Sequence, residues 1–217
     1  MQAEAGEPRE LLRVDSAMPM LLHLLVPLAR PFRARYPRLE LELLSSEGYI
    51  NLIERRVDVA IRAGTLQDSA LHARHLFDSR RRLVAPAYLA QRPRPTTVAD
   101  LACHRLLGLS EPKSLNQWPF ADRGTRAQLV EPQLTSNSGE VLRQLCLQGN
   151  GIACLSDFMV DADIATGRLI ELLADRALPL ALPFHAVYYG DGAPSPKIRA
   201  FVDFLRERLG PATSLQT

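Results

Sequence analysis

The sequence predicts an α/β fold with a parallel sheet, from two observations. Residues 11–64 alternate strand, helix, strand, helix and strand, and right-handed crossovers turn such alternation into a parallel sheet covered by helices. A late strand at 184–189 and a final helix at 196–209 follow a middle region with a different rhythm. The chain has 217 residues, enough for one domain or two small ones.

The individual elements follow from local signals. Strands are predicted at 11–15, 39–44, 57–62 and 152–155, and residues 71–85 form two extended pieces with Asp78 to Arg82 between them. The run Arg80–Arg82 is interpreted as a solvated turn rather than a nucleic-acid patch. A long helix follows Ser16 as its N-cap and is kinked or broken by Pro27 and Pro31. A short helix is expected at 49–56. Thr97 and Asp100 form a capping box.

Two further helices are predicted in the second half of the chain. One follows Asn137 or Ser138 as cap and ends at Gly149-Asn150-Gly151. The next follows Ser156 and ends at Gly167.

Composition excludes several classes of protein. Apolar residues make up 47% and charged residues 23% of the chain, a globular balance. The net charge of +2 is too small for a protein that binds nucleic acid by phosphate contacts alone. No apolar run could span a bilayer, and the first residues show no export signal. Three cysteines without C-x-x-C spacing indicate core residues in a reducing compartment.

Catalytic and metal-binding patterns are weak. His72 and His75 would point to opposite faces of an extended segment, and no G-x-S-x-G motif is present. Gly149-x-Gly151 follows a helix, which is the wrong context for a dinucleotide site. We therefore expect no metal, no cofactor and no enzyme. A small hydrolase or isomerase that uses a serine and a histidine remains the alternative from another class.

Hydroxyl and amide side chains stand at several expected helix starts. These are Ser16, Ser45-Ser46, Thr135 to Ser138, and Ser156. Helix N-termini offer unpaired backbone N–H groups, and beyond the carboxyl ends of parallel strands such groups bind small anions. Each serine could instead only cap its own helix, and both interpretations stay open.

Four motifs resemble the effector-binding domain of LysR-type transcriptional regulators. They are residues 46–64 (SEGYINLIERRVDVAIRAG), 83–89 (LVAPAYL), 149–156 (GNGIACLS), and Asp100-Leu101 followed by His104. The resemblance covers residues 11–209. It implies a fold like type II periplasmic binding proteins, with two Rossmann-like lobes joined by two crossing strands. Lobe I would be 11–84 plus 187–210, lobe II 87–183, the crossings 84–87 and 183–187, and residues 1–10 a linker remnant.

The resemblance also implies a small, anionic effector bound between the lobes. The matching positions are Ser16, Met18, Ser45, Ser46, Arg62, Ala63, Pro86, Thr135, Asn137 and Ser156. Arg62 is the expected partner of an effector carboxylate. The chain departs from the family where aspartate is common, at Glu47 and Asn51, and where proline is common, at Ser156.

The same resemblance implies the partners. We expect a cytoplasmic homodimer or homotetramer, in contact with DNA only through an N-terminal winged helix-turn-helix that this sequence does not contain. The alternative with the same fold is an extracytoplasmic solute-binding protein.

Overall fold

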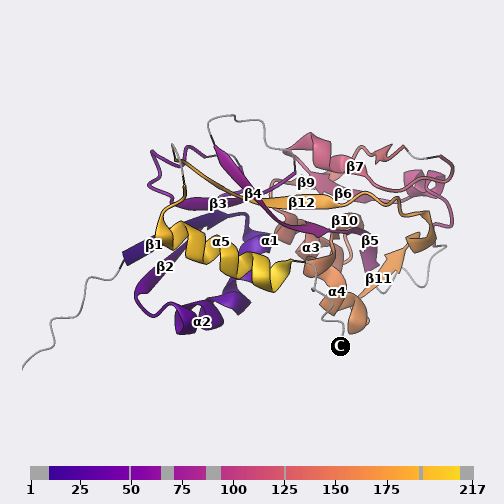
Figure 1. The fold of residues 1–217 in the computed structure, drawn as a ribbon. Helices are drawn as coiled ribbons and strands as arrows, with labels where there is room; N and C mark the ends of the chain where they lie inside the picture. Colours follow the sequence, from indigo (N-terminus) through magenta and orange to yellow (C-terminus); the bar gives the residue numbers. More distant parts are fainter. Residues whose placement is uncertain are drawn as a thin grey trace, which may run out of the picture. The chain divides into compact units, whose positions relative to one another are not determined.

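The computed structural model describes residues 10–48, 50–64, 71–86, 94–124, 126–190 and 193–210. They form two compact units, one from the described residues within 1–78 and 183–217, and the other from those within 79–182. Each unit contains a mixed sheet packed against helices, so the predicted α/β class is confirmed (Figure 1).

The first unit is built on a five-stranded sheet of order β2-β1-β3-β12-β4. β1 pairs in parallel with β2 and β3, while β12 is antiparallel to β3. The carboxyl ends of β1, β2 and β3 therefore share one edge. The strands are β1 (Glu10–Ser16), β2 (Leu39–Ser45), β3 (Val59–Ala63), β4 (His72–Ser79) and β12 (Leu182–Tyr188).

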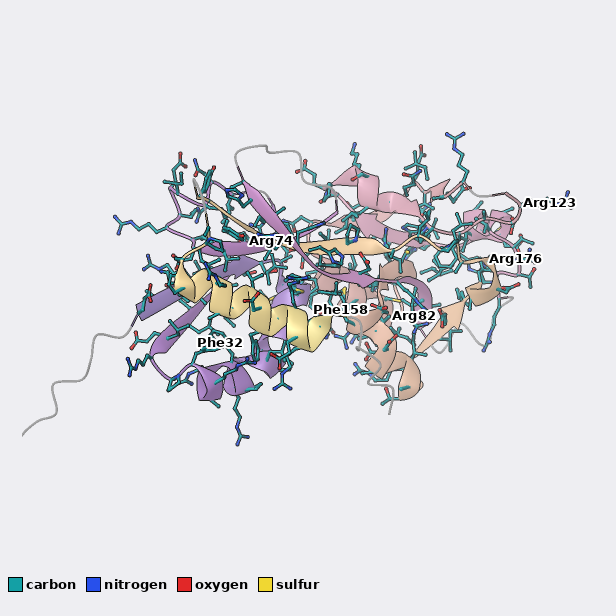
Figure 2. The ribbon with its side chains drawn as sticks, in the orientation of Figure 1. Phe32, Arg74, Arg82, Arg123, Phe158 and Arg176 are labelled. Atoms are coloured by element: carbon teal, nitrogen blue, oxygen red, sulfur yellow. The ribbon has the colours of Figure 1, made fainter. Side chains whose placement is uncertain are left out.

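The first helix of this unit is continuous but irregular. It comprises α1 (Met18–Met20), a π-helical turn η1 (Leu21–Leu25) and α2 (Val26–Arg35). The predicted interruption near Pro27 is thus a π-helical turn, a common response to a missing hydrogen-bond donor. Phe32 of α2 packs against α5 (Pro196–Leu209), and its ring centroid lies 5.3 Å from that of Phe201 and 5.2 Å from that of Phe204 (Figure 2).

The helix predicted at 49–56 is wrong over residues 50–56, because residues 52–56 form consecutive turns; Tyr49 lies outside the described residues. The Asn51 side-chain oxygen accepts hydrogen bonds from the backbone N–H groups of Ile53 and Glu54. Leu52 and Val57 are buried and pack against Ala60 of β3 and Val187 of β12. Leu52 and Val57 therefore attach the segment to the sheet without the apolar face of an amphipathic helix.

The second unit contains a sheet of order β11-β5-β10-β6-β9 and a two-stranded sheet, β7-β8. β6 is parallel to β9 and β10, whereas β5 is antiparallel to β10 and β11. The strands are β5 (Arg81–Pro86), β6 (Leu106–Leu109), β7 (Gln117–Trp118), β8 (Gln128–Leu129), β9 (Leu134–Ser136), β10 (Ile152–Ser156) and β11 (Leu169–Leu172).

Its helices bury one face of this sheet. Leu142 and Cys146 of α3 (Gly139–Leu147) pack with Val160 of α4 (Asp157–Ala165) against Val84 and Ala153. The other face contacts an irregular region that contains Trp118 and Phe120. Short 3₁₀ turns lie at η3 (Ala99–Cys103), η4 (Lys113–Asn116) and η5 (Ala174–Arg176).

The predicted end of α3 is confirmed in detail. Gly149 has a φ of 86°, and its N–H bonds to the Cys146 carbonyl at 2.9 Å. The N–H of Asn150 bonds to the Leu145 carbonyl at 3.0 Å, which completes a Schellman motif. Gly151 then contacts Arg105 so closely that a Cβ would lie 2.4 Å from its carbonyl oxygen.

The solvated turn predicted at Arg80–Arg82 is also wrong. Arg81 and Arg82 belong to β5, and both are half-buried with hydrogen bonds to other elements. Within the described residues, no helix is long and apolar enough to cross a membrane.

Candidate functional site

The serines predicted in the first unit meet at the carboxyl edge of its parallel strands. Ser16 ends β1 and pairs in register with Ser45, which ends β2. The N–H of Ser46 donates to the Ser16 carbonyl at 3.1 Å. Met18 begins the helical segment two residues beyond Ser16, and Ala63 ends β3 at the same edge. The structure therefore brings these five predicted residues to one edge.

Ser16 does not cap the helix, contrary to the sequence prediction. It is the last residue of β1 and 1% exposed, and the N-cap position belongs to Ala17. Its hydroxyl donates to the Ile61 carbonyl at 3.4 Å, which joins the ends of β1 and β3. The Ser16 side chain is therefore buried in the sheet and bonds to a neighbouring strand instead of capping the helix. The hydroxyl oxygen can still accept a hydrogen bond.

A carboxylate already lies at the start of the first helix. Oε1 of Glu47 accepts a hydrogen bond from the backbone N–H of Met18 at 3.3 Å. Glu47 is one of the positions where the chain departs from the family. Its carboxylate occupies one of the backbone N–H donors that the sequence predicts for a bound anion.

Arg62 forms an ion pair inside the first unit. Its Nη2 lies 2.5 Å from Oδ1 of Asp15, and the two side chains are 12% and 1% exposed. Its Nη1 also donates to the Ile61 carbonyl at 3.1 Å. The charge of Arg62 is thus balanced by Asp15 within the unit. Its role toward an effector stays a prediction.

In the second unit, the predicted residues divide into two groups. Ser156 ends β10, is 7% exposed, and precedes α4 without a side-chain capping bond. Thr135 in β9 and Asn137 are exposed and lie near the start of α3. Because β9 and β10 are both parallel to β6, their carboxyl ends share one edge.

Pro86 lies elsewhere. Ser156 pairs with Arg81 at the start of β5, whereas Pro86 ends that strand and pairs with Leu169. Strand geometry places Pro86 roughly 16 Å from Arg81. The second unit therefore does not bring Pro86 to the edge that contains Ser156.

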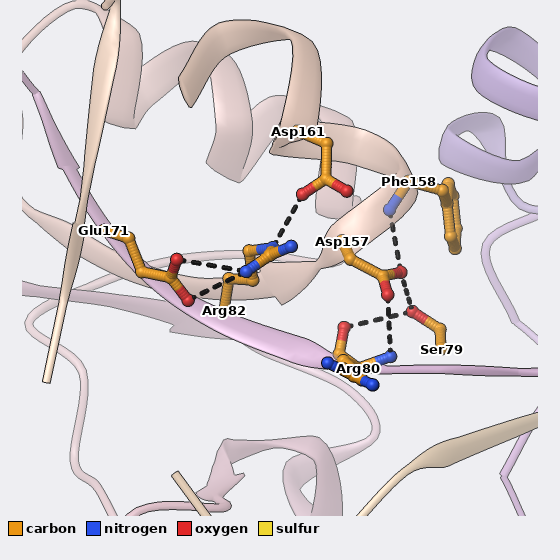
Figure 3. Close-up of polar contacts among 7 residues, drawn as sticks. All are labelled: Ser79, Arg80, Arg82, Asp157, Phe158, Asp161 and Glu171. Carbon is orange, nitrogen blue, oxygen red and sulfur yellow. Dashed lines mark hydrogen bonds and ion pairs between the residues drawn. The ribbon is translucent and has the colours of Figure 1, made fainter. Parts of the chain in front are cut away.

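Polar residues that the sequence analysis missed surround the start of α4 (Figure 3). The Asp157 carboxylate accepts hydrogen bonds from the Ser79 hydroxyl at 2.7 Å and from the N–H groups of Arg80 and Phe158. Arg82 binds Asp161 of α4 and Glu171 of β11. Except for the neighbours Asp157 and Phe158, these partners lie 77 to 89 positions apart in sequence, so no local pattern could have revealed them.

The described residues contain no group of three or more His, Cys, Asp or Glu side chains arranged to bind a metal ion. Cys146 and Cys154 are buried and Cys103 is exposed; none forms a disulfide. Burial raises the pKa of Cys146 to about 12 and that of Cys154 to about 11.

Comparison with known proteins identifies the family. The model of the LysR substrate binding domain matches residues 5–210. The HTH-type transcriptional regulator CrgA of Neisseria meningitidis serogroup C (strain 8013) is 57% identical over 204 residues, which cover 94% of this chain and 68% of that protein. PtxR, an HTH-type transcriptional regulator of Pseudomonas aeruginosa, is 31% identical over 207 residues, 94% of this chain and 66% of PtxR.

Solved structures agree. The CrgA regulatory domain from Neisseria meningitidis has a TM-score of 0.87 and 56% identity, covering 94% of this chain and all (100%) of that chain. Full-length AphB, a virulence activator of Vibrio cholerae, has a TM-score of 0.75 and 25% identity, covering 91% of this chain and 68% of AphB. The chain belongs to the LysR substrate binding domain family and is the effector-binding domain of a LysR-type transcriptional regulator.

Proposed function

We propose that this domain binds a small anionic effector at the carboxyl edge of β1, β2 and β3. The observation that carries the proposal is the hydrogen bond from the Met18 N–H to the Glu47 carboxylate, since an effector carboxylate would find the same donor there. The Ser16, Ser45 and Ser46 side chains supply further hydrogen-bonding groups at this edge. The binding energy would come from backbone N–H groups and hydroxyls acting on a localised negative charge.

In the full-length regulator, the effector would change DNA binding by a helix-turn-helix segment, in a cytoplasmic homodimer or homotetramer. The relatives CrgA and PtxR are named HTH-type transcriptional regulators, which supports a regulatory rather than an enzymatic role. An effector can shift such an assembly only by the difference between its affinities for the two states.

Titration calorimetry tests the binding site. The wild-type domain and Ser16→Ala would be titrated with small aromatic and aliphatic acids and with their neutral amides. We expect an acid to bind, its amide to bind more weakly, and Ser16→Ala to lower the affinity about 5- to 10-fold, the effect of one lost hydrogen bond. Equal binding by wild type and Ser16→Ala would contradict the assignment of Ser16, and equal binding of acid and amide would contradict an anionic effector.

The similarity to CrgA and PtxR supports the regulator over the alternative with the same fold, an extracytoplasmic solute-binding protein. A helix-turn-helix coding segment upstream of Met1 in the gene would support coupling of the effector to DNA binding.

A further inference from the structure

The second unit contains a cavity of about 380 Å³. None of the predicted effector-site residues lies in its wall. Its walls come from the start of β5, the η4–β7 segment, residues 126–127 and residues 180–182. All of these residues belong to the second unit. The effector site proposed above is instead built from β1, β2 and β3 of the first unit, so the two sites share no residue.

Arg81 is the polar anchor of this cavity. Its Nη1 donates to the Leu115 carbonyl at 2.7 Å and its Nη2 to the Cys154 carbonyl at 2.8 Å. These two acceptors fix the guanidinium but carry no net charge. Of its five N–H donors, three remain for another acceptor. Across the described ranges, no carboxylate forms an ion pair with Arg81, in contrast to its neighbour Arg82.

This arrangement favours an anion. A half-buried cation without a counter-charge has lost part of its hydration, and attraction to an anionic partner offsets that loss of solvation free energy. The carbonyls of Leu115 and Cys154 hold the guanidinium in place, so little side-chain entropy would be lost on binding. Arg126, which is exposed, supplies a second positive charge in the cavity wall, and Ser114 supplies a hydroxyl.

Apart from Gln117, the rest of the cavity wall is apolar. It includes Leu115, Pro119, Leu180 and Leu182. Leu180 is 51% exposed, so its side chain has apolar surface that a ligand could cover. An inorganic anion would leave this surface in contact with water. A ligand with both a carboxylate and an alkyl chain would use both parts of the wall.

We propose that this cavity is a second ligand site of the domain and binds a small amphipathic carboxylate. Arg81 binds the carboxylate, Arg126 adds attraction, and Leu180 covers the alkyl chain. The site has the chemistry to recognise a short- to medium-chain fatty acid or a molecule of the same shape and charge.

A titration followed by ¹H–¹⁵N NMR tests the proposal on the intact chain. The probes are straight-chain monocarboxylates from butanoate to octanoate, with hexanamide as the neutral control. We expect shifts at the Arg81 Nε–H and at the amides of residues 114–117 and 126–128. Kd should fall by up to about fourfold for each added methylene until the cavity is full. Equal binding of hexanamide and hexanoate, or shifts confined to other residues, would overturn the proposal.

Matched charge variants separate the site from general electrostatic attraction. Arg126→Gln should raise the Kd of hexanoate about 3- to 10-fold, because one charged contact is lost. Arg123→Gln removes the same charge nearby, from an exposed side chain that does not line the cavity, and should leave Kd unchanged (Figure 2). Equal effects of the two variants would refute a specific site. Leu180→Ala should raise the Kd of octanoate more than that of butanoate. An equal rise for the two acids would exclude contact between Leu180 and the alkyl chain.

Discussion

Arg62 and Asp15 form an ion pair within the first unit, with Nη2 2.5 Å from Oδ1 and the carboxylate 1% exposed. The pair joins β3 to β1 immediately before the edge at which both strands end. An arginine that the sequence suggests for ligand binding is thus also part of the internal structure of the sheet.

Removal of Arg62 should destabilise the domain strongly. Arg62→Met leaves the Asp15 carboxylate buried without a counter-charge, and we expect a loss of about 3–5 kcal/mol in the free energy of unfolding. Adding Asp15→Asn should restore part of that loss. The half-exposed pair between Arg13 and Glu42 is the control, and Arg13→Met should cost about 0–1 kcal/mol. Urea denaturation gives the free energy of unfolding of the wild type, Arg62→Met, the double variant and Arg13→Met. Equal losses for Arg62→Met and Arg13→Met would contradict a structural role for the buried pair.

Glu47 should compete with an anionic effector. Glu47→Gln removes the internal carboxylate from the Met18 N–H while it keeps the size of the side chain. We expect this variant to bind the acids identified by calorimetry several-fold more tightly than the wild type, since like charges near the edge repel. A weaker affinity for Glu47→Gln would show that the Glu47 carboxylate assists effector binding instead.

Arg82 should stabilise the second unit by linking α4 to β11. Its Nε lies 2.6 Å from Oδ1 of Asp161, and its Nη1 lies 3.0 Å from Oε2 of Glu171. Because these groups are partly exposed, we expect Arg82→Met to cost about 1 kcal/mol, less at high salt. Arg80→Met, at an exposed position, should change stability by less than about 0.5 kcal/mol. Thermal unfolding at low and high salt distinguishes Arg82→Met from Arg80→Met. A loss of stability in Arg82→Met that salt does not change would indicate lost packing rather than lost charge pairing.

Asp100 should contribute stability that is lost in acid. Hydrogen bonds from the backbone and side chains of Thr96 and Thr97 lower its pKa from 3.8 to about 2. A lowered folded-state pKa means that the contribution is complete above about pH 4 and disappears as the pH falls to about 2. The difference in stability between wild type and Asp100→Asn should therefore be constant from pH 5 to 7 and shrink below pH 4. A pH-independent difference would contradict the lowered pKa.

Thiol labelling should distinguish the three cysteines. At pH 8, a disulfide reagent should modify the exposed Cys103 in the native protein. Cys146 and Cys154 should not react, because both are buried and their raised pKa values keep the thiols protonated. All three should react in denaturant. In Cys103→Ser, rapid native labelling should be absent. A second rapidly labelled thiol would show that the core of the second unit opens readily.

Local patterns in the sequence predicted the elements that depend on neighbouring residues. The Schellman motif at Gly149 and the capping box at Thr97 and Asp100 each involve residues only a few positions apart, so their signals are visible in the chain. The strands at 11–15 and 152–155 show the apolar character of buried sheets, and the structure has them within one or two residues.

Elements that depend on distant contacts escaped prediction. Residues 52–56 form turns because Leu52 and Val57 pack against the sheet. Arg82 was expected in solvent, yet its partners Asp161 and Glu171 lie 79 and 89 positions away. Ser16 was expected as a helix cap, and its hydroxyl instead bonds to Ile61, 45 positions away.

The sequence by itself determined the α/β class, the order of most elements and the family, because periodicity, caps and motifs are local or ordered along the chain. Only the tertiary structure decided which polar groups are neighbours: Asp15 with Arg62, and Glu47 with Met18. It also placed Arg81 in a cavity wall, where no carboxylate of the described residues pairs with it. The physical reason is that burial and charge pairing arise when strands far apart in the chain become neighbours, and no single stretch of sequence contains both partners.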